Sequence, residues 1–157
     1  MEPHLFECRL AWTGAAHGPT LDYASYVRVY RVDFAGKPSI VGSAAAAFRG
    51  DAALHNPEDL LMAALASCHC LSYLALAARA KIAVIAYEDT ATGRMERKDG
   101  AIRFVDVLLR PRVTLAANSA GDIERAVTLH AKAHAECFIA SSVSFPVRNE
   151  PTVVLAG

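Results

Sequence analysis

The sequence has no excess charge of either sign, since its 157 residues include 16 basic and 16 acidic side chains. A balanced chain lacks the positive surface that attracts nucleic acid or an anionic membrane, so we expect neither as a partner. Internal repeats and low-complexity tracts are also missing. Because the N-terminus shows no cationic start followed by an apolar run, we expect no signal peptide and a cytoplasmic protein.

Uninterrupted apolar stretches are missing too, although apolar residues make up 54% of the chain and can fill a core. The longest apolar-rich segment, 55–80, is a poor transmembrane span because polar residues interrupt it. These residues are Ser67, His69, Ser72 and Arg79. Disulfides are rare in the cytoplasm, so the four cysteines are expected to be reduced, reactive or metal-bound.

The length and the pattern of β-favouring and helical segments predict one domain, residues 1–157, of the α+β class. Strands are grouped in runs rather than alternating with helices, which favours antiparallel sheets. Strands are expected at 5–12, 23–34, 39–44, 81–97, 101–116 and 151–156, with a hairpin tip at 98–100, and helices at 56–79 and 119–143.

The first of these helices has a well-marked start. Asn56 is a good N-cap, Pro57 suits the first helical position, and Glu58 and Asp59 favour the positive end of the helix dipole. Its apolar residues fall around nearly the whole circumference, and such a helix must be covered on all sides. We therefore expect a homodimer that buries two copies of the helix. The alternative is a monomer whose loops cover the second face.

Two cysteines in this helix, Cys68 and Cys70, are two residues apart. That spacing corresponds to about 200° of rotation, so their side chains face opposite ways and cannot form a disulfide without unwinding the helix. A buried cysteine is by default a small apolar residue without chemistry. That reading holds for Cys70 and for Cys8 in the first strand, and His69 is expected to be a hydrogen-bonded core or interface residue.

A zinc site is one hypothesis for the remaining polar residues. His130 and His134 lie one helical turn apart, Cys137 follows three residues later, and Cys68 could complete four nitrogen and sulfur ligands. Against it, strong zinc motifs place two ligands close together in each half, whereas consecutive residues on a helix diverge. We expect no metal and no other cofactor, and zinc remains an alternative.

The run "NPEDLLMAALASCHCLSYLAL" and the later "AHAECFIASSV" resemble the OsmC/Ohr family of thiol peroxidases. Glu58 stands ten residues before Cys68, and His134 stands three before Cys137, as in family members. The segments "YVRVYRVDF", "FRGDAALHNPEDLL" and "CFIASSVSFPV" are similar to the OsmC-like branch. The resemblance covers nearly the whole chain and implies an OsmC-like fold, with sheets around a long central helix in an intertwined homodimer.

The resemblance also implies a role for each matching residue. Cys68 corresponds to the peroxidatic cysteine, which attacks an organic hydroperoxide and becomes a sulfenic acid. Cys137 corresponds to the resolving cysteine, which condenses with it to a disulfide that an unknown dithiol reductant reopens. Glu58 corresponds to the site carboxylate, and Arg28 is our choice for the activating cation, with Arg49 as the alternative.

The chemistry of thiols supports the combination of a cysteine, an arginine and a carboxylate in one site. A free thiol titrates near ~8.5, so a nearby cation is needed to favour the thiolate at neutral pH. An arginine is always charged, and a carboxylate can orient it. Ten helical residues span about 15 Å, so Glu58 cannot reach Cys68 along its own helix. Either a long arginine bridges the gap or a second subunit supplies the carboxylate.

The chain departs from the family at two positions beside the thiols. Cys70 stands where relatives commonly have a bulky apolar residue, and Phe138 stands where many have proline. Neither change removes a reactive thiol, but Phe138 bears on the geometry around Cys137. A non-catalytic, stress-associated binding dimer with the same fold is therefore the second hypothesis.

Overall fold

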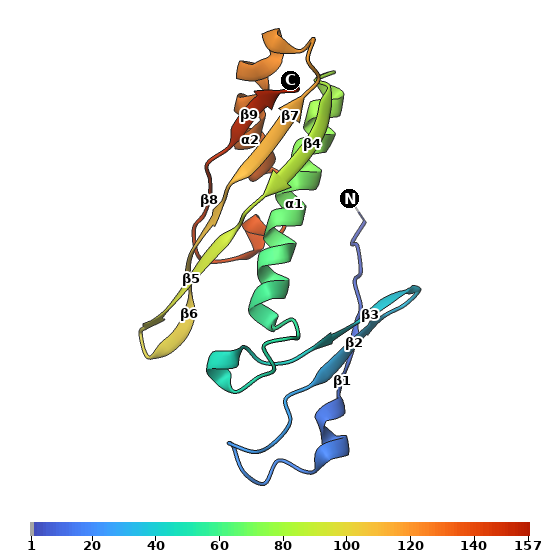
Figure 1. The fold of residues 1–157 in the computed structure, drawn as a ribbon, viewed down its shortest axis with the longest axis vertical. Coiled ribbons are helices and arrows are strands. Elements are labelled where there is room, and N and C mark those ends of the chain that lie inside the picture. The colour runs from blue at the N-terminus through green and yellow to red at the C-terminus, as the bar shows by residue number, and fades with distance from the viewer. Residues whose placement is uncertain (1) are drawn as a thin grey trace. The chain divides into compact units, whose positions relative to one another are not determined.

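The computed structural model describes residues 2–157, which form two compact units divided between Leu61 and Met62 (Figure 1). The first unit contains a three-stranded antiparallel sheet in the order β1-β2-β3. Its strands are β1 (Arg9–Trp12), β2 (Tyr30–Phe34) and β3 (Lys37–Gly42). Gly42 pairs with Tyr30 across the sheet, and a Cβ there would lie 2.4 Å from the tyrosine hydroxyl, so only glycine admits the ring.

The expected long strand 23–34 forms only over β2. Asp22 begins a turn, because its carboxylate accepts the Ala24 N–H at 3.0 Å and its carbonyl accepts the Tyr26 N–H at 3.3 Å. An aspartate that bonds to the following backbone competes with strand pairing. The residues between this turn and β2, Arg28 among them, are therefore irregular, and β1 likewise begins only at Arg9.

Helix α1 (Pro57–Arg79) has the predicted bounds. Asn56 and Asp59 form a reciprocal cap, in which the Asn56 side chain accepts the Asp59 N–H at 2.8 Å and the Asp59 carboxylate accepts the Asn56 N–H at 3.2 Å. Both bonds satisfy donors that have no partner within a helix. This cap fixes the register of every side chain on α1, including Cys68.

The second unit is built on one long, bent hairpin. Strand β4 (Val84–Asp89) pairs with β7 (Pro111–Leu115), and β5 (Thr92–Lys98) pairs with β6 (Ala101–Leu109). The hairpin tip falls at the predicted place, where Asp99 and Gly100 both have positive φ. Pro111 lacks an N–H, and the preceding N–H, that of Arg110, donates to the Asp89 side chain at 2.7 Å instead. The expected strands 81–97 and 101–116 are each divided at this bend.

The expectation of purely antiparallel sheets was wrong in the second unit. β8 (Val147–Asn149) pairs parallel to β6, and β9 (Thr152–Leu155) pairs parallel to β7. The two sheets, β4-β7-β9 and β5-β6-β8, are therefore mixed. The chain reaches β8 only after a helical crossover from β7, and such a crossover permits parallel pairing.

The core of this unit lies between α1, α2 (Ile123–Ala135) and β7, and Figure 1 shows both helices beside the β4-β7-β9 sheet. Tyr73 and Leu76 of α1 meet Val113 and Leu115 of β7 and Ala126 of α2 there. The second helix is shorter than the predicted 119–143. Short 3-10 turns, Ala120–Asp122 and Ala140–Ser142, take up its expected ends.

Helix α1 buries a single stripe. Leu65, His69, Tyr73, Leu76 and Ala77 are buried, whereas Leu71 is 68% exposed. By length and composition alone α1 would qualify as a membrane span, contrary to the expectation from its polar interruptions. The core helix of a soluble protein passes the same test, so this is weak evidence for a membrane. The prediction that α1 is covered on all sides is therefore not met within the single chain, where part of its apolar surface stays exposed.

Candidate active site

The two cysteines of the separate sequence motifs lie together in the second unit. Cys68 is in the middle of α1, and Cys137 follows the C-terminal end of α2. Both are free thiols, and they lie close enough for the Cys68 thiol to raise the pKa of Cys137. Cys137 is 1% exposed, whereas Cys68 is only partly buried. The arrangement is a reduced thiol pair with one accessible and one enclosed member.

The enclosed thiol has a strongly perturbed acidity. Burial raises the pKa of Cys137 to about 11, and the neighbouring Cys68 thiol adds to this shift. The backbone N–H groups of Ala140 and Ile139 donate to the Cys137 sulfur and act in the opposite direction. Cys137 is therefore protonated at neutral pH, yet two donors already point at its sulfur and would stabilise a thiolate formed there. Sequence reasoning missed these donors, because backbone groups leave no signature in the sequence.

Cys70 lies in a different environment. Burial raises the pKa of its thiol, and the nearby carboxylate of Asp89 raises it further. The pKa of Asp89 is itself raised by burial, against a backbone hydrogen bond from Arg110. A half-buried thiol beside a carboxylate is held protonated, which disfavours attack on a peroxide.

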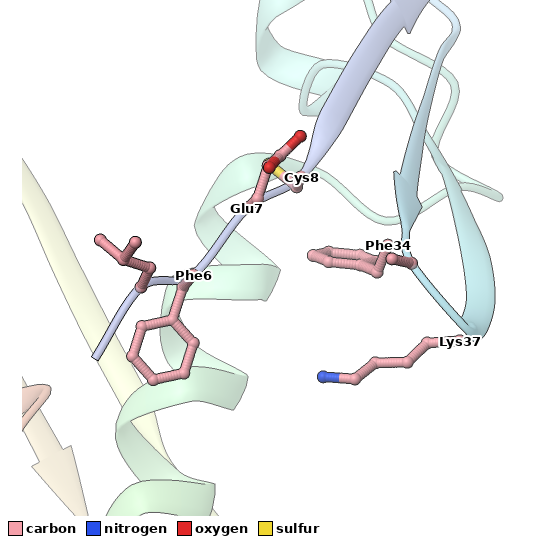
Figure 2. A pocket seen from close by; sticks show the side chains of 7 residues that line it. Phe6, Glu7, Cys8, Phe34 and Lys37 are labelled. Carbon is pink, nitrogen blue, oxygen red and sulfur yellow. The ribbon is translucent and has the colours of Figure 1, made fainter.

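Cys8 lies in the first unit, in the extended segment before β1. Figure 2 shows Phe6, Glu7 and Cys8 of this segment across a hollow of about 420 Å³ from Phe34 and Lys37. Phe6 is 94% exposed and Cys8 is also exposed. The hollow is open and shallow, and it holds a single thiol.

Two buried histidines link the helices that carry the thiol pair. His69 Nε2 and His130 Nδ1 are 3.1 Å apart and share a hydrogen bond, which confirms the expectation for His69. Burial lowers the pKa of each imidazole to about 4; His134 contributes to the shift of His69, and His69 to that of His130. Both are neutral at physiological pH. The sequence signalled a polar core residue at 69 but not its partner.

The zinc hypothesis finds no support in this geometry. Among residues 2–157, no three histidine, cysteine, aspartate or glutamate side chains converge as metal ligands. His130 faces His69 rather than a shared centre with Cys68 and Cys137. Of the four residues proposed as ligands, Cys68 and Cys137 lie together, whereas His130 pairs with His69, which is not one of the four.

The predicted activating arginine lies in the first unit, in the irregular segment before β2 rather than in the strand itself. The Arg28 guanidinium donates to the carbonyls of Tyr26, at 2.9 Å, and Tyr23. It also lies over both rings, 4.0 Å from the centroid of Tyr26 and 4.9 Å from that of Tyr23. Arg49, the alternative, is exposed and 6.0 Å from the Tyr23 ring. Arg28 is thus much the more firmly held of the two.

Glu58 lies in the first turn of α1, also within the first unit. Its Oε2 atom is buried and has no hydrogen-bond partner among residues 2–157, and the same holds for the Tyr30 hydroxyl. Burial raises the pKa of Tyr30, and the carboxylates of Glu58 and Asp59 raise it further. A buried carboxylate oxygen without a partner is rare and needs an explanation, such as a cation that approaches it. The joint action of Arg28, Glu58 and Cys68 stays a prediction.

The α+β fold thus brings together one partly accessible thiol, Cys68, and one enclosed thiol, Cys137. The sequence model described as OsmC-like protein matches residues 50–151, most of the chain, and the chain belongs to this family. No curated protein matches the sequence. The matched region includes Glu58, Cys68 and Cys137 but leaves out Arg28.

Solved structures agree with this assignment. An OsmC-like protein of unknown function from Vibrio cholerae is 29% identical, with a TM-score of 0.87 over 95% of this chain and 99% of that one. An organic hydroperoxide resistance protein from Legionella pneumophila is 15% identical, with a TM-score of 0.69 over 98% and 99%. Another from Elizabethkingia anophelis is 19% identical, with a TM-score of 0.68 over 99% and 100%. These last two show the fold alone, and the predicted OsmC-like α+β fold is confirmed.

Proposed function

We propose that this protein is a thiol peroxidase that reduces organic hydroperoxides through Cys68 and Cys137. The observation that carries the proposal is the close pair of free thiols, with Cys68 partly accessible and Cys137 enclosed. Membership in the OsmC family supports it, as does the fold shared with two proteins named organic hydroperoxide resistance proteins.

The chemistry proceeds in three steps. The Cys68 thiolate attacks the outer oxygen of the hydroperoxide, the O–O bond breaks, and the alkoxide takes up a proton and leaves as an alcohol. Cys68 is then a sulfenic acid. Cys137 attacks its sulfur, an S–S bond forms as the S–O bond breaks, and the hydroxyl leaves with the Cys137 proton as water. A dithiol reductant reopens the disulfide and supplies the two electrons of the cycle.

An apolar surface beside the thiols favours an organic substrate over hydrogen peroxide. Leu71 lies about one helical turn beyond Cys68, and Phe138 directly follows Cys137; they are 68% and 79% exposed. Both line an open hollow of about 500 Å³ in the second unit, together with Ala75 and the polar residues Ser72, Arg79 and Glu136; neither cysteine lines it. An alkyl or aryl group that covers such side chains gains hydrophobic free energy that hydrogen peroxide cannot.

The direct test is hydroperoxide consumption by the purified protein with a small dithiol as reductant. We expect turnover of a bulky organic hydroperoxide at a higher kcat/KM than of hydrogen peroxide. Absence of consumption above the reductant's own rate would refute the peroxidase and favour a non-catalytic binding dimer of the same fold.

We also propose that the protein works as a homodimer. Large apolar side chains remain open in the second unit, where Leu71 and Phe138 are 68% and 79% exposed and line one hollow. Monomers rarely expose contiguous apolar patches beyond a few hundred Å². Sedimentation at low micromolar concentration should give the dimer mass, and a clean monomer there would contradict this proposal.

The arginine and the carboxylate give a further expected result. If the Arg28 cation favours the Cys68 thiolate, Arg28→Met should lower the thiolate fraction near pH 7 by roughly ten- to a hundredfold, equivalent to about 1.4 kcal/mol for each factor of ten. Glu58→Gln should have a smaller effect, because loss of its charge by itself favours the thiolate and offsets the loss of arginine orientation. Alkylation rate against pH measures both.

Arg49→Met serves as the matched control for Arg28→Met. It removes the same charge from an exposed position with one distant aromatic neighbour. We expect an alkylation profile like that of the wild type. If Arg28→Met leaves the profile unchanged and Arg49→Met shifts it, Arg49 is the activating cation.

A further inference from the structure

The pair His69 and His130 is the most enclosed polar group in the second unit. Their exposed fractions are 0% and 1%, and the single hydrogen bond between them joins α1 to α2. The rings are stacked, with centroids 5.4 Å apart and planes 16° apart. Tyr73 also stacks on His130, with ring centroids 4.0 Å apart, and donates its hydroxyl to the Ala126 carbonyl of α2 at 3.2 Å.

Packing alone does not account for this pair. The shared bond uses one nitrogen of each ring, and among the described residues His69 Nδ1 and His130 Nε2 have no partner although both are buried. Two buried polar atoms without partners are unfavourable, and apolar side chains of similar shape would avoid that cost. The two unpartnered nitrogens therefore destabilise the fold more than apolar side chains would at these positions. This points to a role for the pair in the neighbouring site.

The position of the pair relates it to the thiols. His69 directly follows Cys68 on α1, and His130 precedes Cys137 by two helical turns. A second polar link runs from Tyr73 of α1 to the Ala126 carbonyl of α2, and Arg125 of α2 donates to the Ala80 carbonyl directly after α1 at 3.0 Å. Any sliding of α1 against α2 that separates the imidazoles also separates Cys68 from Cys137.

Disulfide formation tolerates little separation. The two sulfurs must approach to about 2.05 Å, with the Cβ atoms roughly 3.5–4.5 Å apart. The two thiols are already neighbours in the reduced protein, since Cys68 raises the pKa of Cys137, so disulfide formation calls for a limited movement of the helices. A rigid link between the helices keeps this adjustment small.

We propose that His69 and His130 are positioning residues that hold α1 and α2 in register so that Cys137 can resolve oxidised Cys68. The expected effect on the rate of disulfide formation rests on the proposed function. In that step the Cys68 sulfenic acid and the Cys137 thiol give a disulfide and water. The part that concerns alignment of the two sulfurs is independent of peroxidase activity.

Neutrality of both imidazoles suits this role. A neutral ring offers one donor and one acceptor nitrogen, so the two rings can share one N–H···N bond, whereas two imidazolium ions would present only donors to each other. The groups that face the pair are Tyr73 of α1 and His134 of α2, with the thiol pair nearby.

His69→Phe tests the inference, because it keeps a stacked ring and removes the hydrogen bond. We expect sulfenic acid formation at Cys68 to stay within about threefold of the wild-type rate, while disulfide formation slows at least tenfold. Trapping with a sulfenic-acid-specific nucleophile should then capture Cys68 in the variant. His69→Gln, whose amide can still donate to His130, should recover most of the resolving rate.

A second measurement separates this inference from the proposed function. Equilibration with a glutathione redox buffer gives the stability of the Cys68–Cys137 disulfide without any peroxide. We expect it to be at least tenfold less stable in His69→Phe, a shift of about 30 mV. Val113→Ala, which weakens the same core without touching either helix link, should leave it within about twofold of the wild type.

The outcomes are distinct. If the wild-type protein forms the disulfide with glutathione but consumes no hydroperoxide, the peroxidase proposal fails, and a disulfide at least tenfold less stable in His69→Phe still supports the alignment role. If His69→Phe matches the wild type in the glutathione equilibrium, or if Val113→Ala shifts it equally, the imidazole pair has no positioning role.

Discussion

Cys68→Ser should abolish hydroperoxide consumption, with a loss of at least about a thousandfold in kcat/KM, as expected when an attacking group is removed. A serine hydroxyl is a far weaker nucleophile than a thiolate at neutral pH and cannot pass through a sulfenic acid. The change is nearly isosteric, so α1 and its partly buried position at 68 should be preserved. The measurement is peroxide consumption under saturating dithiol reductant.

Cys70→Ser is the matched control for that experiment. It makes the same chemical change two residues further along α1, at a thiol whose pKa is raised by burial and by Asp89. We expect turnover within a few-fold of the wild-type value. Loss of activity in Cys70→Ser with retention in Cys68→Ser would exchange the roles of the two thiols.

Acid should destabilise the protein in a window set by the buried imidazoles. The pKa values of His69 and His130 fall from the ordinary 6.5 to about 4 through burial. Between these values the unfolded chain binds protons at both side chains and the folded chain does not, so stability is lost as pH falls from about 6.5 to 4. Each imidazole can contribute about 3 kcal/mol at most.

Other titrating groups do not obscure this window. The hydrogen bonds of Asp33 with Ser39 and Arg31 hold its pKa below the ordinary 3.8, so its contribution is lost only at lower pH. The raised pKa of Asp89 acts in the opposite sense, but it is one carboxyl against two imidazoles. Urea denaturation at pH 7, 5.5 and 4.5 measures the effect.

His69→Phe should flatten this pH dependence by about half, whereas His17→Gln, at an exposed position, should leave the slope unchanged. A wild-type protein as stable at pH 4.5 as at pH 7 would show that the pair accepts protons without loss of the fold, contrary to its buried, neutral state.

Features that depend on residues close together in the sequence could be predicted, whereas contacts between distant segments could not. The start of α1 could be predicted because the Asn56 and Asp59 cap involves residues three apart. The hairpin tip at Asp99 and Gly100 was equally local. The parallel pairing of β8 and β9 could not be predicted, since two short strands carry no signal for their distant partners.

The candidate site follows the same rule. That Cys68 and Cys137 belong together could be anticipated only from a family resemblance, because their contact depends on how α1 packs against α2. The hydrogen bond between His69 and His130 could not be predicted either, because it also depends on how the two helices pack. The sequence indicated only that a histidine interrupts an apolar helix. Arg28 was misplaced in a strand because Asp22 turns the chain just before it.

The central claim, that Cys68 and Cys137 form one redox pair, is tested most directly by peptide mapping after one equivalent of an organic hydroperoxide. The account predicts a Cys68–Cys137 disulfide as the main product, with Cys70 and Cys8 recovered as free thiols. A Cys68–Cys70 or Cys8–Cys137 link as the main product would contradict it.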